Sequence, residues 1–325
     1  MVVSARRYRQ ISIVALASLA TIIVTGAAVR LTGSGLGCDD WPNCSSERLI
    51  DVSSKHAAIE QVNRLFTGVV AAAVIAAVLG AHRRPPHRRD LVVLAWLLVA
   101  GVVGNAVLGG ISVLVDLHPL AVQGHLLLSM MLIVAGTVLV RRSGEPDGVR
   151  RAPVVSRTTV RLVGLHFLLT CVAVFTGTLV TGSGPHAGDE NAARFDFDIA
   201  TVARLHGVSV LTTIAVTLLI VWRIRSTRRE WEALSGSVSS WMFVGVLQAV
   251  IGYVQYLNDV PALLVGIHVA GATAVMIVST VLLLDTTRPV DRSDGSPEQE
   301  GEAGLHHVGE AEDAPVVAVP VDERG

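Results

Sequence analysis

Long apolar runs alternate with short basic or polar segments along most of this chain. A helix needs about 20 residues to cross the hydrocarbon core of a bilayer, which is about 30 Å thick. Eight runs reach that length, at residues 10–31, 58–81, 90–111, 118–140, 159–180, 200–222, 238–257 and 261–285. The pattern predicts an all-α membrane protein with eight transmembrane helices.

Composition agrees with this pattern. Hydrophobic residues make up 51% of the 325 residues and charged residues only 16%, which is too apolar for a soluble chain of this length. The first run lacks a small-residue cleavage site after a short apolar core, so we expect a retained helix and not a removed signal peptide.

The charged residues are sorted between the two ends of the runs. Basic segments stand at residues 5–10, 82–90, 141–151 and 223–230. The intervening loops contain only Arg48, Lys55 and Arg194 as basic residues. Short loops rich in lysine and arginine stay in the cytoplasm, so both termini are predicted to be cytoplasmic.

The composition changes after residue 285. Residues 286–325 are rich in Glu, Asp, Gly and Pro, which predicts a disordered acidic cytoplasmic tail. His306 and His307 in this tail are read as solvated side chains, with adventitious metal binding as the alternative. The net charge of −1 sums a basic membrane face and this tail, and no basic and aromatic pattern indicates nucleic acid.

Several motifs occur twice. The sequence TGSG follows the first run at 32–35 and the fifth run at 181–184. The segment IEQVNRLFTGVV opens the second run and IATVARLHGVSV opens the sixth. Aligning these two segments pairs Arg64 with Arg204 and Phe66 with His206.

The repeat extends to the fourth and eighth runs, each of which opens with a proline followed six or seven residues later by a histidine. We therefore predict two repeated four-helix bundles in parallel orientation. They cover residues 1–142 and 157–285, with a cytoplasmic linker at 143–156.

Three histidines lie at one depth in the membrane. His125, His206 and His268 each stand six or seven residues inside a run, about 10 Å below the outer surface at 1.5 Å per residue. Two imidazoles that face each other across a four-helix bundle are the usual axial ligands of a haem. We interpret His206 and His268 in this way.

The second run carries different polar groups at that depth, namely Glu60, Asn63 and Arg64. Ionisable groups inside a bilayer cost several kcal/mol unless they are paired, ligated or facing a cavity, so a functional role is expected. His166 lies nearer the cytoplasmic side and has no repeat partner, and a hydrogen bond to a neighbouring helix is its structural alternative.

Cys38 and Cys44 lie in the first outer loop, where oxidising conditions allow a disulfide to form. They are either a structural clamp or a reversible thiol pair near a redox centre. A zinc site is disfavoured, because there are two thiols and no suitably spaced histidine pair. Cys171, inside the fifth run, reads as a small buried apolar residue.

Together these features resemble one family. Eight helices in two repeated bundles, TGSG after runs one and five, the outer cysteine pair, IEQVNR at 59–64 and the histidines of runs four, six and eight look like haem A synthase of bacterial membranes. The segment GTLVTGSGPHAGD at 177–189, taken with the histidines, is the most specific part. The resemblance covers nearly all of residues 10–285.

The resemblance implies an enzyme of the bacterial plasma membrane that oxidises the C8 methyl of haem O to a formyl group. The product, haem A, serves cytochrome oxidase of the aa3 type. His206 and His268 would ligate a haem b, His125 would face the iron of the substrate haem O, and Glu60 would be catalytic. The cysteine pair would act in electron transfer or in binding.

The same resemblance suggests haem O synthase and cytochrome oxidase assembly factors as partners, beside membrane lipid. A homo-oligomer stays open. Removing hydride from a methyl group needs a redox metal, while a carboxylate such as Glu60 can accept the released protons or steer water onto a cationic intermediate.

Two arginines lie near the outer surface, where haem propionates would emerge. For Arg64 and Arg204 we favour pairing with propionates over snorkelling to lipid headgroups. Arg64 stands one turn after Glu60, so holding that carboxylate ionised is a further option.

The sequence departs from the family at Asn63, where many members have a histidine. An amide is a poor iron ligand, so His125 alone would hold the substrate iron unless another residue contributes. His56 and His118 are the candidates, although both are better explained as solvated loop residues, as is His186.

Two other classes compete with this interpretation. A b-type cytochrome that passes electrons between quinol and a partner explains His206 and His268 but gives Glu60 and His125 no role. A small-solute transporter explains parallel repeats and buried charges, but leaves three histidines at one depth unused.

Overall fold

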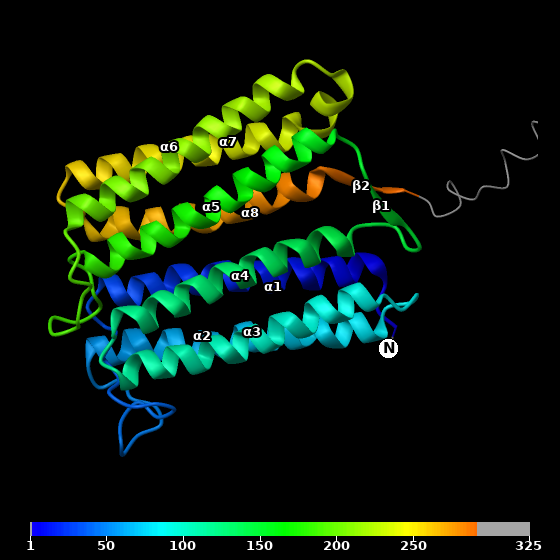
Figure 1. The fold of residues 1–325 in the computed structure, drawn as a ribbon. Helices are drawn as coiled ribbons and strands as arrows, with labels where there is room; N and C mark the ends of the chain where they lie inside the picture. The colour runs from blue at the N-terminus through cyan, green and yellow to red at the C-terminus, as the bar shows by residue number, and fades with distance from the viewer. Residues whose placement is uncertain (1, 291–325) are drawn as a thin grey trace, which may run out of the picture.

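The computed structural model describes residues 2–290, and within them it forms eight α-helices (Figure 1). These are α1 (Ala5–Leu31), α2 (Lys55–Arg83), α3 (Arg89–Leu114), α4 (Pro119–Ser143), α5 (Arg157–Ser183), α6 (Ile199–Ile224), α7 (Arg228–Leu257) and α8 (Ala262–Asp285). All eight are long and apolar enough to cross a membrane, which confirms the predicted fold class. His306, His307 and the remainder of the tail lie outside the described residues.

Helix starts follow from side chains that accept the free backbone N–H groups of the first turn. Ser4, Ser54, Ser156 and Asp198 cap α1, α2, α5 and α6 in this way. Helix α4 instead begins with Pro119, whose fixed φ suits a first helical position.

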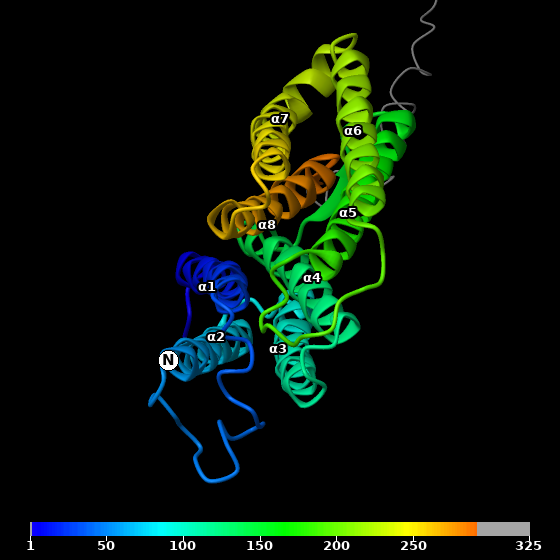
Figure 2. The ribbon, with the colours of Figure 1, turned by 90° about the vertical axis from the view of Figure 1, so that its left-hand side faces the viewer.

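The helices form two rings. Helix α1 contacts α2 and α4, and α3 contacts the same two helices. In the second ring, α5 and α7 each contact α6 and α8 (Figure 2). The rings meet where α8 packs against α1 and α4, and where α4 packs against α5. That the rings are repeats with boundaries at 142 and 157 stays a prediction, as does the cytoplasmic position of both termini.

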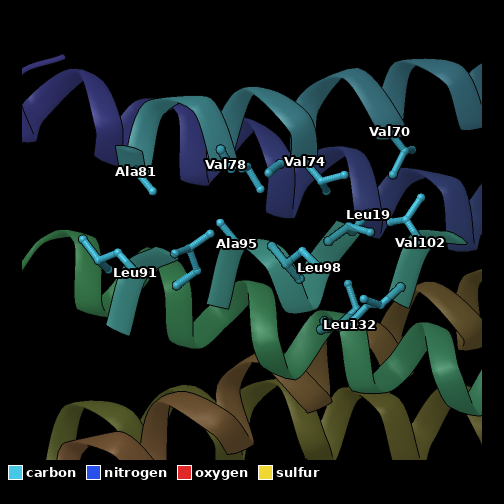
Figure 3. Packing of buried hydrophobic residues seen from close by; sticks show 14 of the residues in the cluster. Leu19, Val70, Val74, Val78, Ala81, Leu91, Ala95, Leu98, Val102 and Leu132 are labelled. Atoms are coloured by element: carbon cyan, nitrogen blue, oxygen red, sulfur yellow. The ribbon is translucent and has the colours of Figure 1, made fainter. Parts of the chain in front are cut away.

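The first core cluster consists mostly of aliphatic and small side chains from α1 to α4, joined by Met276 of α8 (Figure 3). Ala15, Ala77 and Ala95 are fully buried there, and Gly80 lies against the ring of Tyr8. In lipid the apolar side chains gain little from leaving their surroundings, so close backbone approach through small residues supplies much of the packing. A second core cluster lies between helices α5, α6, α7 and α8, around Val163, Ile220 and Leu282.

A short two-stranded sheet was not anticipated by the sequence pattern. Strand β1 (Arg150–Pro153) pairs antiparallel with β2 (Thr287–Val290), and Arg151 donates to the carbonyls of Leu284 and Thr287. Strand β1 lies in the predicted linker and β2 in the predicted tail. Pairing with the linker gives residues 287–290 a regular structure, while the domain boundaries themselves stay predictions.

Helix α7 begins ten residues before the predicted run 238–257. Its first turn contains Glu230, which is buried and accepts hydrogen bonds from Ser156 N–H (2.7 Å) and the hydroxyl of Thr159 (2.7 Å). This polar contact with the start of α5 extends the helix through a segment that hydropathy alone assigns to a basic loop.

Candidate functional site

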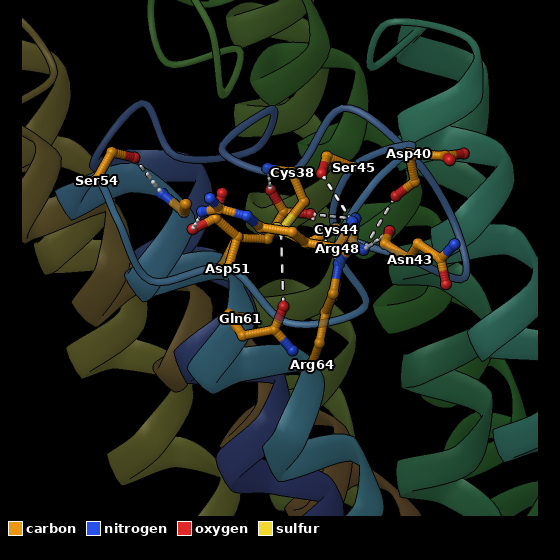
Figure 4. Close-up of a disulfide and its surroundings, with 12 residues drawn as sticks. Cys38, Asp40, Asn43, Cys44, Ser45, Arg48, Asp51, Ser54, Gln61 and Arg64 are labelled. Carbon is orange, nitrogen blue, oxygen red and sulfur yellow. Dashed lines mark hydrogen bonds and ion pairs between the residues drawn. A yellow bond between two sulfur atoms is a disulfide. The ribbon is translucent and has the colours of Figure 1, made fainter.

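The site lies at one end of the helices, termed here the long-loop end, which carries the loops 32–54, 115–118, 184–198 and 258–261. The first of these loops contains the disulfide between Cys38 and Cys44 (Figure 4). Both cysteines are buried, with relative exposures of 0% and 2%, and they pack against Ala57 in the first turn of α2. The two predicted cysteines therefore form a disulfide, which packs against α2, the helix that carries Glu60.

The carboxylate of Glu60 is held at both oxygens. Oε2 accepts a hydrogen bond from the backbone N–H of Cys38 at 2.8 Å, and Oε1 accepts from Arg64 Nε at 3.0 Å and Nη2 at 2.7 Å. Glu60 is 5% exposed. Charge-assisted bonds to both oxygens fix the orientation of the carboxylate and compensate for its burial.

Arg64 connects this carboxylate to the disulfide loop. Its Nη1 donates to the carbonyls of Asp40 at 3.0 Å and Asn43 at 2.9 Å, both inside the loop that the disulfide closes. A guanidinium has five N–H donors, and these contacts use four of them. The structure thus places Arg64 with Glu60 and the loop, the alternative that the sequence left beside propionate pairing.

Gln61 is a member of the site that sequence analysis did not single out. It is 5% exposed, and its Oε1 lies 3.8 Å from Cys38 Sγ. A disulfide sulfur carries no hydrogen, so this is a contact and not a hydrogen bond. A polar residue next to Glu60 in an apolar run was the available signal.

His206 on α6 and His268 on α8 face each other, with ring centroids 6.3 Å apart and planes at 80°. His206 Nδ1 lies 3.0 Å from the carbonyl of Ala173, which makes it the donor and leaves Nε2 as a free lone pair. The ring spacing accommodates two metal–nitrogen bonds of about 2 Å each between the imidazoles. The pair fits an iron ligated from both sides.

Each of the three histidines packs against a glycine of the preceding helix, termed here its glycine seat, and all three rings have the same orientation toward it. A Cβ at Gly109, Gly177 or Gly252 would lie 3.1, 3.2 or 2.8 Å from Cε1 of His125, His206 or His268 respectively. In each case Nδ1 is the next nearest ring atom and Nε2 the third. The prediction that these histidines share one depth thus extends to a shared orientation against the preceding helix.

The remaining predicted groups fall into separate places. Arg204 is exposed, and no hydrogen bond ties it within residues 2–290. His56 Nδ1 lies 2.9 Å from Ser34 Oγ, and His186 Nε2 lies 2.8 Å from the carbonyl of Val260, so both stabilise loops. His118 is exposed before α4.

His166 and Cys171 lie away from the long-loop end. His166 is fully buried, its Nδ1 lies 3.0 Å from Thr217 Oγ1, and its ring meets Trp241 edge-on at 4.6 Å. This is the helix-to-helix contact given above as its structural alternative. Cys171 is a free, partly buried cysteine that packs against the first core cluster.

The two rings are also joined at the long-loop end by Arg30, another residue that sequence analysis missed. Its Nε donates to the carbonyl of His186 at 2.6 Å and its Nη2 to that of Thr181 at 2.9 Å. Gly35 N–H donates to the carbonyl of Gly188 at 2.9 Å. These bonds hold the end of α1 and the first TGSG segment against residues 181–188, which include the second TGSG segment.

Eight membrane-crossing helices with intramembrane histidines in matched positions define a multi-pass all-α membrane protein. A family model described as cytochrome oxidase assembly protein matches residues 9–280, and the chain belongs to this family.

Two curated relatives show the extent of the similarity. The chain is 25% identical over 258 residues to "Heme A synthase" of Shouchella clausii, a match that covers 76% of this chain and 85% of the relative. It is 26% identical over 287 residues to "Heme A synthase" of Listeria welshimeri, covering 84% and 92% respectively.

Proposed function

We propose that this protein is a haem A synthase, which oxidises the C8 methyl of haem O to a formyl group in the bacterial plasma membrane. Family membership and the named relatives support a role in haem A biosynthesis and cytochrome oxidase assembly. The observation that carries the proposal is the buried carboxylate of Glu60, which is hydrogen-bonded at both oxygens and lies at the same end of the helices as the three glycine-seated histidines.

The second ring is the proposed place of a resident haem b. His206 and His268 would hold its iron from opposite sides, and the fit rests on their facing rings and on the bond at His206 Nδ1, which leaves Nε2 with a free lone pair. When bound, this group supplies one-electron redox chemistry that side chains lack. Thr176 and Ala173 fix the His206 ring for that purpose, as second-shell partners do for metal ligands in general.

The first ring is the proposed place of the substrate haem O, with His125 facing its iron. Glu60 would accept the protons released when the methyl group is oxidised, and its fixed orientation makes it a defined acceptor. Arg204, exposed near the long-loop end, keeps its proposed role as a partner of haem propionates. Arg64 is assigned instead to positioning Glu60, because four of its five N–H donors already bind Glu60 and the disulfide loop.

The disulfide is proposed to act as a clamp. It closes the loop whose backbone supplies one donor to Glu60 and two acceptors to Arg64. Breaking it would loosen the groups that orient the carboxylate. The product would pass to an aa3-type cytochrome oxidase, and haem O synthase would supply the substrate from the surrounding membrane.

The facing histidine pair alone would also suit a b-type cytochrome that only transfers electrons. That function gives no role to the cluster of Glu60, Arg64 and the loop, or to His125 in its glycine seat. A transporter would leave all three seated histidines without a role.

Two measurements test the proposal. The reduced-minus-oxidised spectrum of the purified protein should show a b-type band, which a transporter would lack. Cells that express the chain beside a haem O synthase should then contain haem A in their extracted pigments. Haem O without haem A, from protein that carries the b-type band, would favour the electron-transfer cytochrome.

A further inference from the structure

Each successive pair of helices places a glycine of the first helix against one polar side chain of the second at the long-loop end. The four contacts are Gly26 with Asn63, Gly109 with His125, Gly177 with His206, and Gly252 with His268. Three of the four positions therefore hold an imidazole and the fourth holds an amide.

The amide occupies the position of His206 in the other ring. On α5 the residues Thr176 and Gly177 contact His206, with Thr176 Oγ1 3.2 Å from Nδ1. On α1 the same dipeptide, Thr25 and Gly26, contacts Asn63. Thr25 Oγ1 donates to Asn63 Oδ1 at 2.8 Å, and a Cβ at Gly26 would lie 4.0 Å from Asn63 Nδ2.

These contacts revise the sequence alignment, which paired His206 with Phe66. The side chain of Phe66 packs against the apolar core cluster of the first ring, away from Gly26. Asn63, and not Phe66, is the structural counterpart of the histidine. The first ring thus has one seated histidine, His125, where the second ring has two.

No other imidazole completes the position within residues 2–290. His56 is bonded to Ser34 and His186 to the carbonyl of Val260, while His118 is exposed at the start of α4. Asn63 itself is a weak candidate, because Thr25 already donates to its oxygen and iron favours imidazole over a neutral amide.

We propose that the first ring holds the iron of haem O through His125 alone and leaves the coordination position facing Asn63 open to a small exogenous ligand. This inference rests on the proposed function. Glu60 precedes Asn63 by three residues and so lies on the same face of α2. A ligand at the open position would therefore be on the side of the catalytic carboxylate.

Carbon monoxide is the probe, because it binds ferrous haem only where a coordination position is free. The full chain is purified from cells that express it beside a haem O synthase, then reduced and exposed to carbon monoxide. We expect the haem O or haem A it carries to bind carbon monoxide, while the haem b between His206 and His268 does not. The haem b band is the internal reference for folded protein.

The variant Asn63→His should convert the open position into a second imidazole ligand and abolish carbon monoxide binding. Two matched controls, Asn63→Ala and Phe66→His, should leave it as in the wild type. If a histidine variant is not recovered with its haem b band, carbon monoxide binding by the wild type and by Asn63→Ala still tests whether the coordination position is open.

Wild-type protein whose haem O is six-coordinate and insensitive to carbon monoxide would overturn this inference and leave the proposed function standing. Unchanged carbon monoxide binding in Asn63→His with an intact haem b band would overturn it as well. Protein that never carries haem O or haem A would overturn the proposed function and the inference with it.

Discussion

Replacing both bridged cysteines, as Cys38→Ser with Cys44→Ser, should loosen the loop that orients Glu60 and Arg64. The bridge joins residues six positions apart, so it closes a loop of about seven residues. The chain-entropy relation gives such a bridge about 2.4 kcal/mol at 25 °C. That free energy corresponds to a factor of about 50 in the equilibrium between closed and open loop, since 1.4 kcal/mol is tenfold.

Hydrogen–deuterium exchange of the detergent-solubilised protein measures this loss directly. The backbone N–H of residue 38 is protected by its bond to Glu60 Oε2, and serine keeps that N–H. Peptides covering residues 38–44 should exchange faster by up to about 50-fold, because protection follows the free energy of local opening. Peptides from the loop 184–198 should be unchanged.

The matched control is Cys171→Ser, which removes the free cysteine in α5 without touching the loop. Unchanged exchange at 38–44 in the double variant would show that Arg64 and Glu60 hold the loop without the bridge, and would refute its role as a clamp. Equal acceleration in Cys171→Ser would assign the effect to general destabilisation instead.

Three further outcomes are expected. His206→Ala or His268→Ala should remove the b-type band that Glu60→Ala retains, because only the histidines face each other across the second ring; equal loss in all three variants would contradict this division. Arg30→Met should remove the charged hydrogen bonds to the carbonyls of Thr181 and His186 at a cost of about 1.5–3 kcal/mol for each bond, and exchange should rise in peptides of the loop 184–198 but not at 38–44. Asp198 caps α6, and hydrogen bonds from the Thr201 hydroxyl and N–H lower the pKa of its carboxyl. The ionised cap is therefore present at neutral pH and is lost as acid protonates the carboxyl, so exchange in the first turn of α6 should rise at low pH. Asp198→Asn, whose amide is also a good cap, should remove this pH dependence.

The apolar runs predicted the helices well because spans in a bilayer have a physical minimum length. All eight predicted runs coincide with helices, and most ends agree within a few residues. The start of α7 was missed because a buried Glu230 that caps a neighbouring helix looks like a loop charge in a hydropathy plot. The pairing of β1 with β2 was missed because both strands are short and joined only by a contact between distant segments.

The site was predictable where a residue type is costly in lipid. Glu60, His125, His206 and His268 were singled out on that ground, and their roles stay predictions. The partners of Arg64 were not predictable, because a sequence does not say whether a carboxylate, a carbonyl or an external anion binds a guanidinium. The counterpart of His206 needed the structure too, since spacing along two helices is ambiguous by nearly one turn.

The most direct test of the proposed function is the identity of the haem that the protein releases. The chain is expressed beside a haem O synthase in a host without its own haem A, and the extracted haems are separated and identified by mass spectrometry. The wild type should yield haem A, and Glu60→Ala should yield haem O while keeping the b-type band. Wild-type protein that carries the b-type band and yields haem O but no haem A would contradict the account.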